Sequence, residues 1–214
     1  MFDATRILSR SEIGRVLDDL RRKRRSVNTR QNDVIFRLSC CCGLRVSEIV
    51  GLNLSDVRVS NGRPHLHIRG ETAKRGRSRN IPLNWDGATL AALEAWKRER
   101  IDQGAAGSDP FLCSLSKGTW GKRLHVRNAQ HRWTTAIRCL CSCGQRDHAR
   151  DCRVRGLSIH AGRHSFCSHA LAGGRTLAAV RDAAGHRNVS TTSLYLHTVT
   201  DDDDTVGNLF EFSR

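Results

Sequence analysis

The 214-residue chain has one tyrosine, Tyr195, and few aromatic residues of any kind. It has no apolar run long enough to cross a bilayer and no signal-peptide core near its N-terminus, so we expect no membrane partner and a cytoplasmic location. Internal repeats and long low-complexity linkers are missing as well. With 38% hydrophobic residues in regular spacing, the chain is expected to fold around a core of its own.

Negative charge is also scarce. There are 36 Lys and Arg against 21 Asp and Glu, which gives a net charge of +15. A positive field of this size favours a polyanionic partner, and nucleic acid is the commonest one. From composition alone, a merely soluble basic protein is the alternative.

The nine cysteines do not indicate a disulfide framework, because their number is odd and three of them, Cys40–Cys42, are consecutive. These three lie in an apolar helical pattern and are expected to be small buried hydrophobic residues with reduced thiols. A second group lies in "CLCSCGQRDHARDC", residues 139–152. There Cys141, Cys143, His148 and Cys152 are candidate zinc ligands. Because the C-x-C spacing is tighter than usual, a basic loop with reduced cysteines is the alternative.

Periodicity and capping signals predict a mostly helical chain. Ser9 and Glu12 have the spacing of a capping box that begins the first helix. Further helical patterns cover 29–42, the stretch from Arg45, the stretch from Asp86, the region near 121–140, the stretch from His160, 176–184, and the segments around Tyr195 and the C-terminus. Short strands are predicted at 57–59, 65–68 and 79–83. We therefore expect an α+β fold with a small antiparallel three-stranded sheet.

Six side chains in separate motifs suggest one site. They are Arg45 in "GLRVSE", Lys74 between the second and third strands, His160 and Arg163 in "SIHAGRHSF", His186 at a helix–loop junction, and Tyr195 on the helix after it. Two arginines can bind the non-bridging oxygens of one phosphodiester, and nearby cations or a base can help a phenol to ionise. Apart from Glu48, these motifs hold no carboxylate, so a hard-metal site is not expected. Together they predict metal-free phosphoryl transfer to tyrosine.

The motifs resemble those of the tyrosine recombinase (phage-type integrase) family, from "LSRSEI" to "YLHT". That family has an Arg in a G-L-R-x-S-E box, a Lys in a β-hairpin, an H-x-x-R-H box and an L-G-H box before the nucleophilic Tyr. Here the positions fall on Arg45, Lys74, His160, Arg163, His186 and Tyr195. Lys74 is chosen over Arg75, Arg77 and Arg79 because of its distance from "NIPL". Two departures are mild: "AAGH" replaces L-G-H, and a glycine precedes Arg163.

The resemblance implies a fold and partners. Residues 1–214 are expected to form one catalytic domain of the DNA breaking-rejoining type, with 139–152 as an insertion and without the family's N-terminal core-binding domain. No metal, ATP or other cofactor is expected. The expected substrate is double-stranded DNA, bound by a homotetramer on two duplexes, with a monomer as the alternative when DNA is absent.

The resemblance also implies a reaction, site-specific DNA recombination or integration through a 3′-phosphotyrosine intermediate. The expected roles are Tyr195 as nucleophile, Arg45 and Arg163 as phosphate ligands, Lys74 as general acid, His160 as general base, and His186 as a hydrogen-bond partner of the phosphate. Glu48 is expected to support the site from behind. Two alternatives stay open: DNA relaxation of the type IB topoisomerase kind, and a catalytically idle DNA-binding accessory protein.

Overall fold

The computed structural model describes residues 6–60, 62–73, 76–143 and 152–196. The α-helices are α1 (Arg10–Arg22), α2 (Val27–Cys40), α3 (Val46–Gly51), α4 (Gly87–Asp102), α5 (Val126–Ala136), α6 (Ile159–Ala172), α7 (Leu177–Ala184) and α8 (Val189–Ser193). Short 3₁₀ helices are η2 (Leu54–Asp56), η3 (Gly70–Thr72), η4 (Ile137–Leu140) and η5 (Arg153–Gly156). The strands are β1 (Val57–Arg58), β2 (His65–Ile68) and β3 (Arg79–Pro82). The predicted α+β, mostly helical class is confirmed.

The three strands form one antiparallel sheet in the order β1-β2-β3. Leu66 of β2 pairs with Val57 on one side and with Ile81 on the other, and all three side chains are buried. This apolar row is the face that the sheet turns toward the core, as expected from the period of two in a strand. The predicted three-stranded antiparallel sheet is confirmed, although β1 and β3 each end one residue earlier than the sequence pattern indicated.

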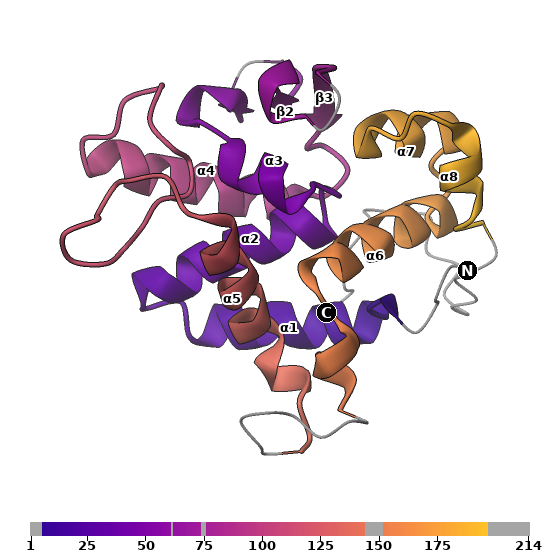
Figure 1. The fold of residues 1–214 in the computed structure, drawn as a ribbon, viewed down its shortest axis with the longest axis horizontal. Helices are drawn as coiled ribbons and strands as arrows, with labels where there is room; N and C mark the ends of the chain where they lie inside the picture. The colour runs from indigo at the N-terminus through magenta and orange to yellow at the C-terminus, as the bar shows by residue number, and fades with distance from the viewer. Residues whose placement is uncertain (1–5, 61, 74–75, 144–151, 197–214) are drawn as a thin grey trace.

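Helix α2 is the central element, and α1, α4, α5 and α6 pack around it (Figure 1). Its Phe36 ring stacks on Trp133 of α5 with the ring centroids 5.2 Å apart. The helix ends two residues earlier than predicted, and Gly43 follows it with φ 69°. A side chain could not replace that glycine, because a Cβ would lie 2.3 Å from the Phe166 ring. The predicted burial of Cys40–Cys42 is confirmed.

Helix α6 is held at its N-terminal end by polar contacts from two buried side chains. The Ser39 hydroxyl donates to the carbonyl of Ile159 at 2.7 Å, and the Trp133 indole N–H donates to the carbonyl of Leu157 at 2.8 Å. Gly162 faces the same two side chains, and a Cβ there would lie 2.4 Å from the Ser39 hydroxyl and 2.7 Å from the Trp133 ring. The close packing of α6 on α2 and α5 explains why a glycine stands at this position.

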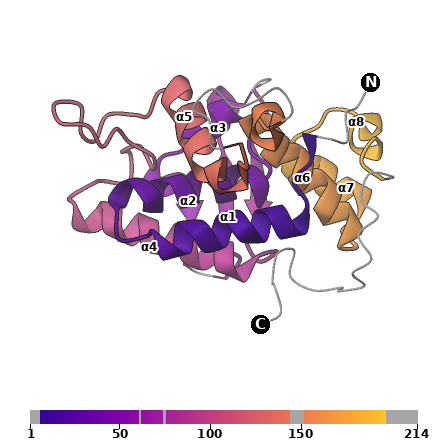
Figure 2. The same cartoon turned by 90° about the horizontal axis from the view of Figure 1, so that it is seen from below.

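Helices α7 and α8 lie at one end of the molecule, where α7 packs beside β3 (Figures 1 and 2). Gly185 ends α7 in the left-handed region at φ 67°, so His186 lies at the predicted helix–loop junction. The prediction that Tyr195 lies on the next helix is wrong, because α8 ends at Ser193 and Tyr195 follows in a turn. None of the helices in the described ranges has the length and apolar character to cross a membrane.

Some predictions concern residues outside the described ranges. These residues are Lys74, His148 and the segment near the C-terminus.

Candidate active site

Three arginines from separate elements converge on the C-terminal end of α7. Arg79 Nε donates to the carbonyl of Ala183 at 2.9 Å, Arg163 Nη2 to that of Ala184 at 2.5 Å, and Arg45 Nη2 to that of Gly185 at 3.2 Å. The three carbonyls are consecutive. Because the last carbonyls of a helix lack partners within the helix and carry partial negative charge, they are suitable acceptors for cations. The end of α7 therefore gathers the three guanidinium groups in one place.

The carboxylate of Glu48 binds two of these arginines, and its side chain is fully buried. Arg79 binds both carboxylate oxygens at 2.9 Å, and Arg45 Nη1 donates to Oε1 at 3.1 Å. Burial alone would raise the pKa of Glu48, but the hydrogen bond and charge of Arg79, together with Arg45, outweigh it and hold that pKa below its ordinary value. Glu48 is thus a charged carboxylate that fixes two guanidinium groups, as the supporting role predicted for it requires.

The site has more positive than negative charge, since three guanidinium groups face one carboxylate. Burial, with the positive charges of Arg45 and Arg79 nearby, lowers the pKa of Arg163 to about 10. Arg163 remains charged at neutral pH, and its second described contact is a hydrogen bond from Nη1 to the carbonyl of Gly43 at 2.6 Å. Among the described residues, Arg45 and Arg163 each use two of their five N–H groups. The remaining donors and the excess charge suit an oxyanion.

Tyr195 lies in the same region and is buried, with 6% of its surface exposed. Its hydroxyl oxygen is 2.6 Å from Nδ1 of His164, and its ring lies nearly parallel to that of His186 with the centroids 6.4 Å apart. Burial raises the pKa of Tyr195 above its ordinary value of 10, and the charge of Arg163 opposes that shift in part. The phenol is therefore un-ionised in this arrangement.

Both histidines beside Tyr195 are neutral at physiological pH. Burial, with the positive charges of Arg163 and Arg45, lowers the pKa of His186 to about 4. Burial also lowers the pKa of His164 below its ordinary value of 6.5, and the charge of His160 acts in the same direction. Nδ1 of His186 lies 2.9 Å from the Thr192 hydroxyl. Two neutral imidazoles, each with a polar partner, flank the phenol.

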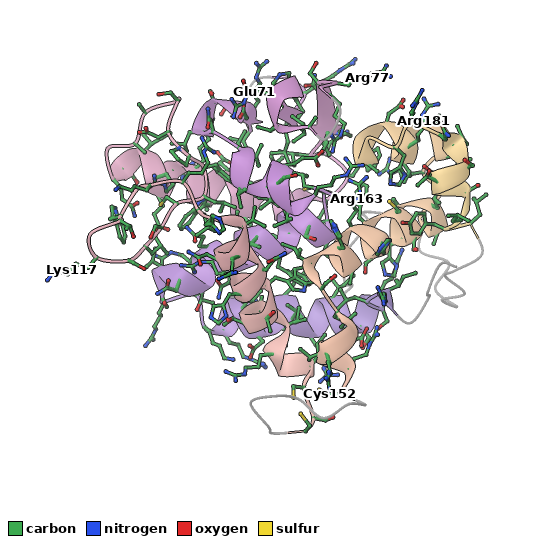
Figure 3. The ribbon with its side chains drawn as sticks, viewed as in Figure 1. Glu71, Arg77, Lys117, Cys152, Arg163 and Arg181 are labelled. Atoms are coloured by element: carbon green, nitrogen blue, oxygen red, sulfur yellow. The ribbon has the colours of Figure 1, made fainter. Side chains whose placement is uncertain are left out.

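The structure brings together four of the six predicted site residues, namely Arg45, Arg163, His186 and Tyr195. The other two differ. His160 is the second residue of α6, close enough to influence the pKa of His164, but its side chain is exposed whereas that of Arg163 is buried (Figure 3). Lys74 lies outside the described residues, so its place in the site stays a prediction.

Sequence reasoning did not assign a role to two residues of this site. His164 is the last residue of the H-x-x-R-H box and has no predicted role, yet it contacts the Tyr195 hydroxyl. Arg79 was considered only as a substitute for Lys74, yet it joins Glu48 to the end of α7. Arg79 begins a predicted strand, and a cation that is partly buried there needs a partner, which was a sign that it has a structural role. The sequence does not show that this partner is Glu48.

A mostly helical domain with partly or fully buried arginines around a helix end and a phenol beside them has the groups that a protein acting on phosphate esters uses. The sequence profile described as "Phage integrase family" matches residues 6–201. The chain belongs to this family, the tyrosine recombinases, and has the fold of their catalytic domain.

Two relatives illustrate the family membership. A tyrosine recombinase XerC of Roseiflexus sp. (strain RS-1) is 34% identical over 167 residues, which cover 78% of this chain and 47% of the relative. A tyrosine recombinase XerC of Chromobacterium violaceum is 37% identical over 164 residues, covering 75% and 46%. The chain thus spans about half the length of the curated relatives it matches.

Solved structures agree on the fold. The crystal structure of XerA recombinase superimposes with a TM-score of 0.67 at 18% identity, over 89% of this chain and 60% of that one. A lambda integrase(75-356) dimer bound to a COC′ core site gives a TM-score of 0.61 at 14% identity, over 93% and 62%. At such identities the likeness concerns the fold alone.

Proposed function

We propose that the chain is the catalytic domain of a site-specific DNA recombinase that cuts and rejoins DNA through a 3′-phosphotyrosine intermediate, without metal or ATP. The observation that carries the proposal is that the single tyrosine lies near the buried Arg163 of the arginine cluster, with an imidazole on its hydroxyl. The names of the relatives support it, since they are tyrosine recombinases. Two solved structures of similar fold, XerH in pre-cleavage and post-cleavage complexes with its difH substrate, support DNA as the partner.

The two arginines of the predicted site bind the scissile phosphate. Arg45 and Arg163 keep free donors after their contacts with the protein, and two guanidinium groups can stabilise the additional negative charge of a pentacovalent transition state. Glu48 and Arg79 act as positioning residues, because they hold the arginines and the end of α7 together without needing to touch the phosphate.

The proton of the phenol leaves to His164. Neutral His164 accepts at Nδ1, 2.6 Å from the hydroxyl oxygen, so Tyr195 can lose its proton as its oxygen bonds to phosphorus. As this P–O bond forms, the bond to the 5′ oxygen breaks, and that oxygen takes up a proton. Lys74 stays our candidate for the donor, and His160 stays the alternative acceptor that the family resemblance implies.

His186 serves the phosphate as a neutral donor. If the Thr192 hydroxyl donates to Nδ1, 2.9 Å away, the ring carries its proton on Nε2. A pKa of about 4 keeps the imidazole in this neutral form across the physiological range. A neutral ring donates one hydrogen bond to a non-bridging oxygen without competing with the arginines for the negative charge.

The assembly is part of the same proposal. We propose that residues 1–214 act as one catalytic domain with 139–152 as an insertion, on double-stranded DNA and in a homotetramer on two duplexes. The net charge of +15 supports binding to the phosphate backbone. A neighbour titled as a dimer bound to a core site supports assembly on DNA.

The decisive experiment uses a nicked duplex from which the cleaved fragment diffuses away, so that the covalent intermediate accumulates. The duplex carries DNA that flanks the gene itself. We expect a protein–DNA adduct that survives denaturing electrophoresis for the unchanged chain and no adduct for Tyr195→Phe. Salt-sensitive DNA binding with no adduct in either protein would instead identify an idle accessory protein.

A second assay separates the two enzymatic alternatives. A recombinase joins strands from two labelled duplexes, whereas an enzyme of the type IB topoisomerase kind relaxes supercoiled plasmid without joining them. Plasmid relaxation with no joined product from a chain that forms the adduct would overturn the assignment as a recombinase.

A further inference from the structure

The 139–152 insertion has a feature that the proposed reaction does not use. Cys141 directly follows η4, and Cys152 directly precedes η5, so the two residues mark the ends of the segment between these 3₁₀ helices. Cys143 lies near both. The three sulfur atoms all lie within 4.8 Å of one another, although Cys152 is nine residues from Cys143 in the sequence. Folding therefore brings three thiols to one point.

The distances between the sulfur atoms match those around a metal ion. Cys141 Sγ lies 3.1 Å from Cys143 Sγ and 3.6 Å from Cys152 Sγ. Zinc binds thiolates at about 2.3 Å in a tetrahedron, which puts neighbouring sulfurs about 3.8 Å apart. Disulfide-bonded sulfurs are about 2.05 Å apart, so the two distances from Cys141 are too long for a disulfide. One ion can thus contact all three sulfurs with only small side-chain movements.

The surroundings suit a structural ion. Cys152 is buried at 8% exposure, while Cys141 and Cys143 are half-buried and pack against the edge of the core. Soft sulfur donors favour zinc over magnesium or calcium. Figure 3 places Cys152 at the end of the molecule away from Arg163, so the cluster is separate from the candidate active site.

We propose that Cys141, Cys143 and Cys152 bind one zinc ion as thiolates. Each thiol releases its proton on binding, and a further donor completes the tetrahedron. His148, which the sequence also suggested, lies outside the described residues and is not needed for the proposal.

The ion has a structural role. It ties the end of η4 to the start of η5, and these two helices pack on each other. Arg153, next to Cys152, binds Glu12 of α1 at 2.7 Å, and η5 leads through Leu157 into α6, which carries His160 and Arg163. Metal at this point therefore stabilises the connection that leads into α6.

The test measures metal in the whole folded chain. The protein is prepared without a metal-affinity tag, in reducing buffer with zinc, and dialysed against a weak chelator before elemental analysis. We expect about one zinc per chain, and far less in Cys141→Ser and Cys152→Ser. The matched control is Cys139→Ser, whose thiol lies 3.9 Å from the Arg15 carbonyl and outside the cluster; it keeps its zinc.

Cobalt supplies a readout that does not depend on how the variants fold. Co²⁺ added to the metal-free chain is expected to give the intense thiolate-to-cobalt absorption and the visible bands of a tetrahedral site, and zinc is expected to displace it. Only trace zinc together with no thiolate–cobalt absorption in the reduced, folded chain would overturn the proposal. Full zinc in Cys152→Ser, or its loss from Cys139→Ser as well, would also overturn it.

Discussion

The arginine cluster, defined as Arg45, Arg79 and Arg163 with Glu48, differs from the tyrosine segment, residues 189–196, in how firmly it is held. The cluster is bound to carbonyls at the end of α7 and to a buried carboxylate by hydrogen bonds from the residue that precedes α3, from β3 and from α6. Its members lie on elements packed around α2 and α7. This half of the site is preformed for an oxyanion.

The tyrosine segment has a smaller set of anchors. Its helix α8 has five residues, and Val189, Leu194 and Leu196 expose 41%, 57% and 50% of their surfaces. Two side-chain hydrogen bonds within the described part of the chain hold it to its surroundings, that of His186 with Thr192 and that of His164 with Tyr195. Segments with few buried apolar contacts open at low free-energy cost. The comparison teaches that the arginines are held by charged hydrogen bonds to a buried carboxylate and a helix end, whereas the segment that carries Tyr195 has more exposed apolar side chains and can shift without disturbing them.

The largest expected effect comes from breaking the arginine cluster. Glu48→Gln removes a fully buried carboxylate and leaves two partly buried cations without their countercharge, so we expect a loss of about 3 kcal/mol of unfolding free energy. Glu94→Gln is the control, because Glu94 pairs with Arg98 on the surface and its loss should cost below about 0.5 kcal/mol. Urea unfolding of both variants measures the difference. Equal losses would show that the cluster is no more firmly held than a surface pair.

The second effect concerns the charge that the cluster presents. Arg163→Lys keeps one positive charge but loses the fork that binds two carbonyls, so adduct formation on nicked DNA should slow on the order of 10²–10³-fold. Arg181→Lys, on α7 beside Asp182, is the matched control and should keep the rate (Figure 3). An unchanged rate in Arg163→Lys would contradict the role of Arg163 as a phosphate ligand.

The third effect tests the tyrosine segment. His164→Gln removes the acceptor of the phenol proton, so the adduct rate should fall on the order of 10²-fold. In the unchanged chain the rate should decline as pH falls through the lowered pKa of His164, because a protonated imidazole cannot accept; His164→Gln should lack that limb. If His160→Gln removes the limb and His164→Gln does not, His160 is the acceptor.

The smallest effect is the response of stability to acid. The pKa of His186 is about 4 in the folded chain and 6.5 ordinarily, so between these values the unfolded chain binds more protons and stability falls as pH falls. After allowing for solvent screening, the part due to His186 is about 1 kcal/mol. His186→Gln should therefore lose less stability between pH 7 and pH 4.5 than the unchanged chain. His131→Gln, an exposed position on α5, should follow the unchanged chain.

Local patterns predicted the elements well, because caps and periodicity depend on neighbours in the sequence. The Ser9–Glu12 capping box is present, and the three strands pair as expected. The predicted helix over Tyr195 was wrong, since α8 stops at Ser193 and residues 194–196 form a turn. The predicted end of α2 was two residues too late, because Cys41 and Cys42 lie between the last helical residue and Gly43.

The sequence by itself determined the basic charge, the order of helices and strands, and which side chains could react with a phosphate. Only the tertiary structure decided that His164 rather than His160 contacts the phenol, that Arg79 joins the cluster, and that the thiols of Cys141, Cys143 and Cys152 meet. The reason is that such contacts join distant parts of the chain. Arg45 and the Gly185 carbonyl are 140 residues apart, and their meeting depends on how whole helices pack on α2.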